Sequence, residues 1–220
     1  MQKVFALGSC RLIEPVKLLV KRGTIHFTNQ AQSWYAHTTK EMLQRLDHMQ
    51  GHARLPDALL PLILDQDSCK TAPADCAIPF VLPAIGIFEI SSRNIRWHAG
   101  YALHSTLLRK RQFADTTDRI APFTATEADI VALRARFRHL IIGCNIVYGS
   151  NLTDPDVNRQ KLNDFLKSMA QKYEGIQVVD PNDTLDPAQD LRDRDHYNAN
   201  FVPRLADIYA GVLAQYSNAA

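Results

Sequence analysis

Five short apolar runs are spaced along the chain, and segments with helical periodicity lie between them. The runs show little polar alternation, which is typical of strands buried on both faces of a parallel sheet. Strands that alternate with helices predict a parallel sheet covered by helices on both sides. The expected fold class is therefore α/β, with five parallel strands. The runs are Val4–Leu7, Ile25–Phe27, Val81–Ile90, Leu140–Val147 and Ile176–Val179.

Helix-start signals indicate where several of the intervening helices begin. Thr38-x-x-Glu41 and Thr124-x-x-Glu127 each have the residues of a capping box. Asp154 and Pro155 predict an N-cap and a first helical residue, and a further helical stretch is expected from about Tyr101. Two more helices are expected from the apolar spacing of Leu12–Val20 and Phe201–Tyr216.

The length and charge of the chain limit its class. Its 220 residues, 46% of them hydrophobic, are enough for a full core and fit one domain over residues 1–220 better than two. The 25 basic and 23 acidic residues are dispersed and leave a formal net charge of +2, so we expect no nucleic-acid partner.

Met1–Lys3 leads directly into the first strand and no run is long enough for a membrane span, so we expect a soluble, cytoplasmic protein.

The four cysteines show no zinc-like CxxC spacing, so we expect no metal site and read them as free thiols. A disulfide between Cys69 and Cys76 is the alternative that their proximity in sequence leaves open. The four are Cys10, Cys69, Cys76 and Cys144.

The first strand ends abruptly in a short polar turn, Gly8-Ser9-Cys10-Arg11, before the first helix. Such a turn can present a nucleophile at the carboxyl edge of a parallel sheet. The alternative is a tight turn with a merely buried thiol. Arg11 follows at once, and we expect it either to pair with an acidic helix residue or to bind an anionic group of a substrate.

A second polar segment, Asp193-Arg194-Asp195-His196-Tyr197-Asn198, stands just before the last helix. We expect a tight loop in which the Asp193 carboxylate holds the His196 imidazole, as a base in acyl transfer requires. The end of strand one and the segment after strand five open on the same sheet edge, so the two pieces are expected to meet. In the alternative interpretation, Asp193 and Asp195 only cap the last helix and His196 is a surface residue.

The turn at Gly8-Ser9-Cys10 together with Asp193-x-x-His196 resembles the SGNH, or GDSL-like, hydrolase and acyltransferase superfamily. The resemblance is to its Gly-Ser-Cys and Gly-Asn-Cys branches, which are linked to bacterial polysaccharide modification. It implies a flavodoxin-like three-layer α/β/α sandwich with a five-stranded parallel sheet, and it assigns Asp193 and His196 to the family's D-x-x-H element.

The chain departs from the family pattern in two places. An ungapped alignment puts Cys10, and not Ser9, at the position of the nucleophilic serine. The family's glycine and G-x-N-D oxyanion elements are not plainly present, and the nearest candidates are Ser92 and Asn94 after strand three. Because Cys10 begins a helix beside a histidine, we also expect its thiol pKa to be lowered.

The predicted function is acyl transfer, in which Cys10 (or Ser9) attacks an ester or thioester, His196 moves the proton, and Asp193 orients His196. Backbone N–H groups after Gly8 are expected to help hold the oxyanion. The resemblance implies transfer to a sugar or polysaccharide hydroxyl, with acetyl-coenzyme A as the first donor to try and no tightly bound cofactor. A carboxylester hydrolase and a non-catalytic binding domain are the alternatives.

Other polar residues are expected to be structural. His37, His98 and His104 have no partner at motif spacing, so they are interpreted as structural or surface residues. Cys144 and Asn145 end strand four and can line the same edge, with core packing as the expected role.

Overall fold

The computed structural model describes residues 1–29, 35–63, 81–103, 115–149, 152 and 154–217. Its main element is a five-stranded sheet, all parallel, with the strand order β2-β1-β3-β7-β8. This confirms the α/β fold and the flavodoxin-like three-layer sandwich. The strands are β1 (Gln2–Leu7), β2 (Ile25–Phe27), β3 (Ile85–Glu89), β7 (His139–Gly143) and β8 (Ile176–Val179).

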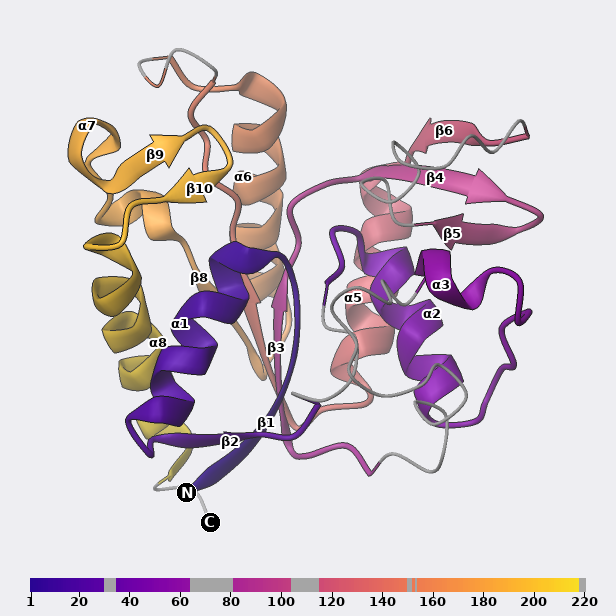
Figure 1. The fold of residues 1–220 in the computed structure, drawn as a ribbon, viewed down its shortest axis with the longest axis horizontal. Helices are drawn as coiled ribbons and strands as arrows, with labels where there is room; N and C mark the ends of the chain where they lie inside the picture. The colour runs from indigo at the N-terminus through magenta and orange to yellow at the C-terminus, as the bar shows by residue number, and fades with distance from the viewer. Residues whose placement is uncertain (30–34, 64–80, 104–114, 150–151, 153, 218–220) are drawn as a thin grey trace.

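Alternate side chains of the central strands enter two separate apolar layers, because successive residues of a strand point to opposite faces. Val4 and Ala6 of β1 pack with helices α1 and α8, whereas Phe5 and Leu7 pack with α2, α5 and α6. Figure 1 shows α1 and α8 together on one side of the sheet, with α2 and α5 on the other. The helices are α1 (Cys10–Lys21), α2 (Thr39–Met49), α3 (Leu60–Ile63), α5 (Phe123–Arg134), α6 (Val157–Lys172), α7 (Pro187–Asp190) and α8 (Phe201–Ser217), with the 3-10 turn η2 (Pro181–Asp183).

A small antiparallel sheet is inserted between β3 and α5, in the order β5-β4-β6. A helix was expected from about Tyr101, but Tyr101 begins β5 and pairs with His98 of β4; residues 104–114, over which that helix would continue, lie outside the described residues. Ala99 and Gly100 between them both have positive φ, 49° and 84°, which makes a two-residue hairpin turn. In Figure 1, β5 is the strand next to α2 and β6 lies farthest from it. The strands are β4 (Asn94–His98), β5 (Tyr101–Leu103) and β6 (Thr117–Ile120).

One of the three helix-start predictions is confirmed and two are wrong. Thr38 caps α2 in a complete capping box with Glu41. The α5 helix begins at Phe123 with Pro122 as its N-cap, one residue before the expected box at Thr124. The α6 helix is capped by Asp156, whose side chain accepts from two backbone N–H groups, and not by Asp154.

The segment before the last helix forms a hairpin where a tight loop was expected. Strands β9 (Leu191–Asp193) and β10 (His196–Tyr197) pair antiparallel, with Asp193 opposite His196. Cys10 and Cys144 are free thiols, whereas Cys69, Cys76 and His104 lie outside the described residues. Within the described ranges, every helix is too short or too polar to cross a bilayer.

Candidate active site

A cleft of about 800 Å³ opens at the carboxyl edge of the main sheet. It is lined by the turn after β1, the segments after β3 and β7, the start of α6 and the β9–β10 hairpin. The carboxyl ends of parallel strands share one edge, and ligands of open α/β sheets bind there. The structure therefore brings together all but two of the predicted site residues as lining: Ser9, Cys10, Arg11, Ser92, Asn94 and His196.

Gly8 is required by a close approach, and its φ is not positive. A Cβ atom at Gly8 would lie 2.8 Å from the Cβ atom of Glu89 and 2.9 Å from Cδ2 of Leu12. The Gly8 carbonyl accepts from the Ala36 N–H at 3.1 Å, next to a parallel bridge between Gly8 and Tyr35. The turn is therefore packed between two neighbouring segments of chain.

Ser9 is the N-cap of α1, and its hydroxyl is committed to structure. Its side chain accepts from the Arg11 N–H, and its Oγ donates to Oε2 of Glu89 at 2.5 Å. The Ser9 N–H donates to the same oxygen at 2.8 Å. Ser9 is only 3% exposed, so its oxygen already serves as a cap and has little access to the cleft.

Glu89, which the sequence analysis did not single out, joins the turn to β3. Its carboxylate is almost fully buried and also accepts from Nε of Arg11 at 2.7 Å. Burial alone would raise the pKa of Glu89, but Arg11 and the Ser9 hydrogen bonds hold it below its ordinary value. Arg11 does pair with an acid, as one of the two expectations had it, but the acid lies on a strand and not on a helix.

Cys10 is the one residue of the Gly8–Arg11 turn that is partly exposed, and it lines the cleft. Partial burial raises its pKa, with Glu89 acting in the same direction and Arg11 opposing it. The expected lowering of this pKa is therefore wrong, because desolvation outweighs the effect of the arginine. At neutral pH the thiol is protonated and needs a base before it can act as a nucleophile.

His196 and Asp193 form the predicted pair. Nδ1 of His196 lies 2.8 and 2.9 Å from the two Asp193 carboxylate oxygens. This contact assigns the proton to Nδ1 and leaves Nε2 as the basic nitrogen. The Asp195 N–H also donates to Asp193, at 2.8 Å. Burial alone would raise the pKa of Asp193, but these two contacts lower it.

The imidazole and the thiol line the same cleft but are not hydrogen-bonded to each other in the described part of the chain. Such contacts are often loose in a free enzyme and tighten when substrate binds.

An arginine of α6 fixes the turn of the hairpin. Arg159 donates to the Asp195 carboxylate at 2.6 Å and to the Arg194 carbonyl at 2.7 Å. Arg11 donates to the Asp195 carbonyl at 3.3 Å. Asp195, which the sequence offered as a helix cap, is therefore bound from two sides, and the hairpin is held over the Cys10 turn.

Three further residues of the cleft wall were expected to be structural or were not considered. Nδ1 of His37 lies 2.7 Å from Oγ of Ser91, and burial lowers the pKa of His37. Asn145 donates from Nδ2 to the Ser91 carbonyl at 2.8 Å, while its Oδ1 is buried without a partner in the described residues. The sequence indicated these three residues only by their positions, because they follow β2, β3 and β7 at the carboxyl edge of the sheet.

The two candidate oxyanion residues, Ser92 and Asn94, lie on the wall formed by the segment after β3. Oγ of Ser92 accepts from the Asn94 N–H at 2.9 Å, and the Ser92 N–H donates to the His37 carbonyl at 3.1 Å. The Ser92 hydroxyl still has its own proton to donate. In the described ranges, no group of three His, Cys, Asp or Glu side chains is placed to hold a metal ion.

The sequence model of one protein family, the TviD N-terminal domain, matches residues 2–123, which is more than half of the chain. The chain belongs to this family. The matched part contains the Gly8–Arg11 turn, Glu89 and the small sheet, while the His196 hairpin lies beyond it. A search of curated protein sequences finds no significant match.

Several solved structures share the fold at low sequence identity. An acetyl esterase mutant solved with an acetate ion superposes with a TM-score of 0.55, at 12% identity and over 100% of both chains. A carbohydrate esterase of family 3 from Talaromyces cellulolyticus gives 0.52, at 11% identity and also over 100% of both chains. An α/β hydrolase from the metagenome of Lake Arreo, Spain, gives 0.50, at 14% identity, over 95% of this chain and 94% of that chain.

Proposed function

We propose that the protein is an acyl-transfer enzyme with Cys10 as its nucleophile, His196 as its base and Asp193 as the residue that orients the base. The observation that carries the proposal is that Ser9 and Cys10, although adjacent in the turn, have different environments. Ser9 is buried and bound to Glu89, while Cys10 is partly exposed in the cleft that His196 also lines, and Asp193 holds His196 from behind. A thiol and a base in one cleft, with a carboxylate that orients the base, are the parts that covalent acyl transfer needs.

The proposed reaction has two steps. In the first, Nε2 of His196 takes the thiol proton, the Cys10 sulfur bonds to the carbonyl carbon of the donor, and the leaving group departs with that proton. In the second, an acceptor O–H gives its proton to His196 and its oxygen bonds to the acyl carbon. The C–S bond then breaks, and the sulfur takes the proton from His196 to regenerate the thiol and the neutral imidazole. The Asp193 carboxylate stabilises the imidazolium that forms in both steps.

Two donors are assigned to the developing oxyanion. The Cys10 N–H stands at the N-terminus of α1 and donates to no other group in the described residues. The Ser92 hydroxyl lines the same cleft and keeps a proton to donate. A helix N-terminus favours negative charge, so the oxyanion gains from the helix dipole as well.

Transfer to a sugar hydroxyl, with acetyl-coenzyme A as donor, is the activity we favour. The resemblance to Gly-Ser-Cys branches of the SGNH superfamily supports it, and two of the structural neighbours are an acetyl esterase and a carbohydrate esterase. A cysteine thioester keeps the acyl group activated for a hydroxyl acceptor. Hydrolysis is the second candidate, because the same neighbours are esterases and water can replace the acceptor in the second step.

Intact-mass measurement tests the proposal. The wild type, Cys10→Ala and Ser9→Ala are each incubated with acetyl-coenzyme A and, separately, with p-nitrophenyl acetate. We expect one acetyl adduct on the wild type and on Ser9→Ala, mapped to Cys10, and none on Cys10→Ala. An adduct that persists in Cys10→Ala and disappears in Ser9→Ala would reject the cysteine and replace it with a serine enzyme.

A further inference from the structure

One arginine of the cleft differs in its partners from the other arginines that line it. The Asp195 carboxylate lies 3.8, 2.6 and 3.8 Å from guanidinium nitrogens of Arg11, Arg159 and Arg194. Arg93, between β3 and β4, also lines the cleft. It has no acidic partner in the part of the chain that the structure describes. Arg93 therefore brings a positive charge to the cleft that these residues do not neutralise.

The carboxylates of the elements around Arg93 have other partners. Glu41 of the cleft lining accepts from two backbone N–H groups at the start of α2, at 2.6 and 3.0 Å. Asp156 caps α6. The first turn of α5 has no acidic residue, and Glu127 in its second turn bonds to Lys172 at 2.5 Å. These acids are therefore engaged elsewhere, and the counter-charge for Arg93 has to come from a ligand.

The Arg93 guanidinium is held in place before any ligand arrives. It lies over the Phe123 ring, 3.7 Å from the ring centre, and donates one N–H to the Ala121 carbonyl at 2.6 Å. The Ala121 N–H in turn donates to the Arg93 carbonyl at 2.8 Å. A guanidinium has five N–H donors, so this one keeps several that have no acceptor among the described residues. A fixed, planar group with donors to spare is suited to an oxyanion.

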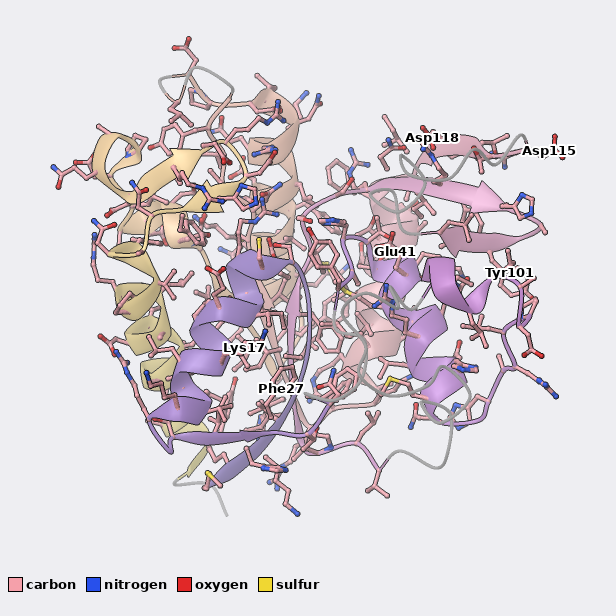
Figure 2. The ribbon with its side chains drawn as sticks, in the orientation of Figure 1. Lys17, Phe27, Glu41, Tyr101, Asp115 and Asp118 are labelled. Carbon is pink, nitrogen blue, oxygen red and sulfur yellow. The ribbon has the colours of Figure 1, made fainter. Side chains whose placement is uncertain are left out.

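Arg96, three residues further on, shows the contrast with a paired arginine. It donates to Asp118 at 2.5 and 2.6 Å, and this contact raises the pKa of Arg96. In Figure 2 the labelled Asp118 marks this ion pair, on the side of the small sheet away from α2. Burial lowers the pKa of Arg93, and no acid opposes that effect. The charge of Arg93 is therefore partly desolvated without compensation.

The Cys10 thiol and the Arg93 cation belong to different sides of the main sheet. Cys10 begins α1, whereas the Arg93 guanidinium packs on Phe123 at the start of α5. Figure 1 shows α1 and α5 on opposite sides of the sheet. A ligand that reaches both must carry its negative charge at a distance from its reactive carbonyl. Coenzyme A thioesters have this form, because a long flexible arm separates the thioester from the phosphates.

We propose that Arg93 binds a phosphate group of the acyl donor. The guanidinium offers two parallel N–H groups to two phosphate oxygens, in the geometry that arginine favours. The proposal rests on the acyl-transfer function proposed above, and it narrows the donor to a thioester that carries phosphate. Removal of the phosphate from the donor and removal of the charge from Arg93 should then weaken binding through the same contact, so that either loss makes the other one neutral.

Acetylation of Cys10 by donors with and without phosphate tests this assignment. The donors are acetyl-coenzyme A and S-acetylpantetheine, which has the same thioester and most of the arm but no phosphate. The variants are Arg93→Gln and, as the matched control, Arg96→Gln, because Arg96 is paired and lies outside the cleft lining. We expect the half-saturating concentration of acetyl-coenzyme A to rise roughly tenfold in Arg93→Gln only, as the loss of a charge-assisted hydrogen bond predicts. S-acetylpantetheine should acetylate all three proteins alike, and an equal loss with both donors overturns the proposal.

A third donor identifies which phosphate is bound. Acetyl-dephospho-coenzyme A lacks the ribose phosphate but keeps the pyrophosphate. If Arg93→Gln still weakens the use of this donor, Arg93 binds the pyrophosphate. If the effect of Arg93→Gln disappears with this donor, Arg93 binds the ribose phosphate. Both results support the phosphate site.

Binding without chemistry separates this inference from the proposed function. Coenzyme A is titrated calorimetrically into Cys10→Ala protein, alone and combined with Arg93→Gln or Arg96→Gln, at low and at high salt. Binding that weakens with added salt and with Arg93→Gln only supports the phosphate site even if Cys10 is never acetylated, a result that would reject only the enzyme. Equal affinity with and without Arg93→Gln, or no binding of coenzyme A to the Cys10→Ala protein, overturns the site.

Discussion

Replacement of Glu89 by glutamine removes the buried charge that holds the Gly8–Arg11 turn. Glu89 accepts three hydrogen bonds from Ser9 and Arg11, at 2.5, 2.7 and 2.8 Å. Glutamine has the same shape, but one of its terminal groups is a donor that faces donors, and Arg11 loses its counter-charge at 6% exposure. Removal of one partner of a buried ion pair costs about 3–5 kcal/mol. At 2–4 °C per kcal/mol for a chain of this length, the midpoint of thermal unfolding should fall by roughly 6–20 °C.

The loss of stability in Glu89→Gln should depend on pH, and the direction of that dependence follows from the pKa of Glu89. The pKa of Glu89 is lower in the folded protein than in the unfolded chain. Its contribution is therefore complete above the ordinary carboxyl pKa of about 4.3 and disappears as the pH falls through the folded-state value. The free energies of unfolding of the wild type and Glu89→Gln should differ most at neutral pH and converge below pH ~4.

Urea unfolding followed by fluorescence measures the difference at each pH. Asp47→Asn is the control, because Asp47 also accepts from an arginine, Arg136 at 2.5 Å, but is 34% exposed and lies outside the cleft lining. An ion pair of that kind contributes about 0.2–1 kcal/mol. A Glu89→Gln loss no larger than that of Asp47→Asn, or a loss that is constant across the acid range, would refute the reasoning.

Three further predictions concern other parts of the molecule. His196→Ala and Asp193→Ala should each lower turnover of p-nitrophenyl acetate by roughly 100- to 10,000-fold, and the double variant should be no worse than the poorer single one; losses that multiply would argue against a joint role. Alkylation of Cys10 by iodoacetamide should have its pH midpoint above that of N-acetylcysteine, since burial raises the thiol pKa, and a midpoint below it would contradict that cause. Gly211→Ala should raise the free energy of unfolding by roughly 0.5–1 kcal/mol, because this glycine lies in α8 with open space around a Cβ atom, and urea unfolding would show an unchanged or lower value if the space is not open.

The main sheet was predictable because its strands carry their signal locally. Ile25–Phe27 and Ile176–Val179 are strands at the predicted residues. The small sheet was not predictable in this way, since β6 is exposed along all four of its residues and has no apolar pattern. β6 is a strand because it pairs with β4, which lies about 20 residues earlier in the chain, and strand formation that depends on such non-local pairing leaves no pattern in a short window of sequence.

The candidate site was predictable in its parts but not in its connections. His196 was found from its spacing to Asp193, and Cys10 from its place in the turn after strand one together with the resemblance to the SGNH superfamily; the structure places both at one cleft. Glu89 was missed although its signal was present, because it is a lone acid inside an apolar run and such an acid must be paired if the run is buried. The pKa of Cys10 was predicted in the wrong direction, since burial depends on how distant segments pack around the turn.

The hairpin that carries His196 has a consequence for how the protein is made. Arg11 and Asp195 touch although they are 184 positions apart in the chain. During synthesis the Cys10 turn and its neighbouring strand β3 emerge long before the hairpin does, and domains acquire such non-local contacts last. In the proposed mechanism, the Cys10 thiol therefore gains His196 as its base only after the C-terminal segment has docked.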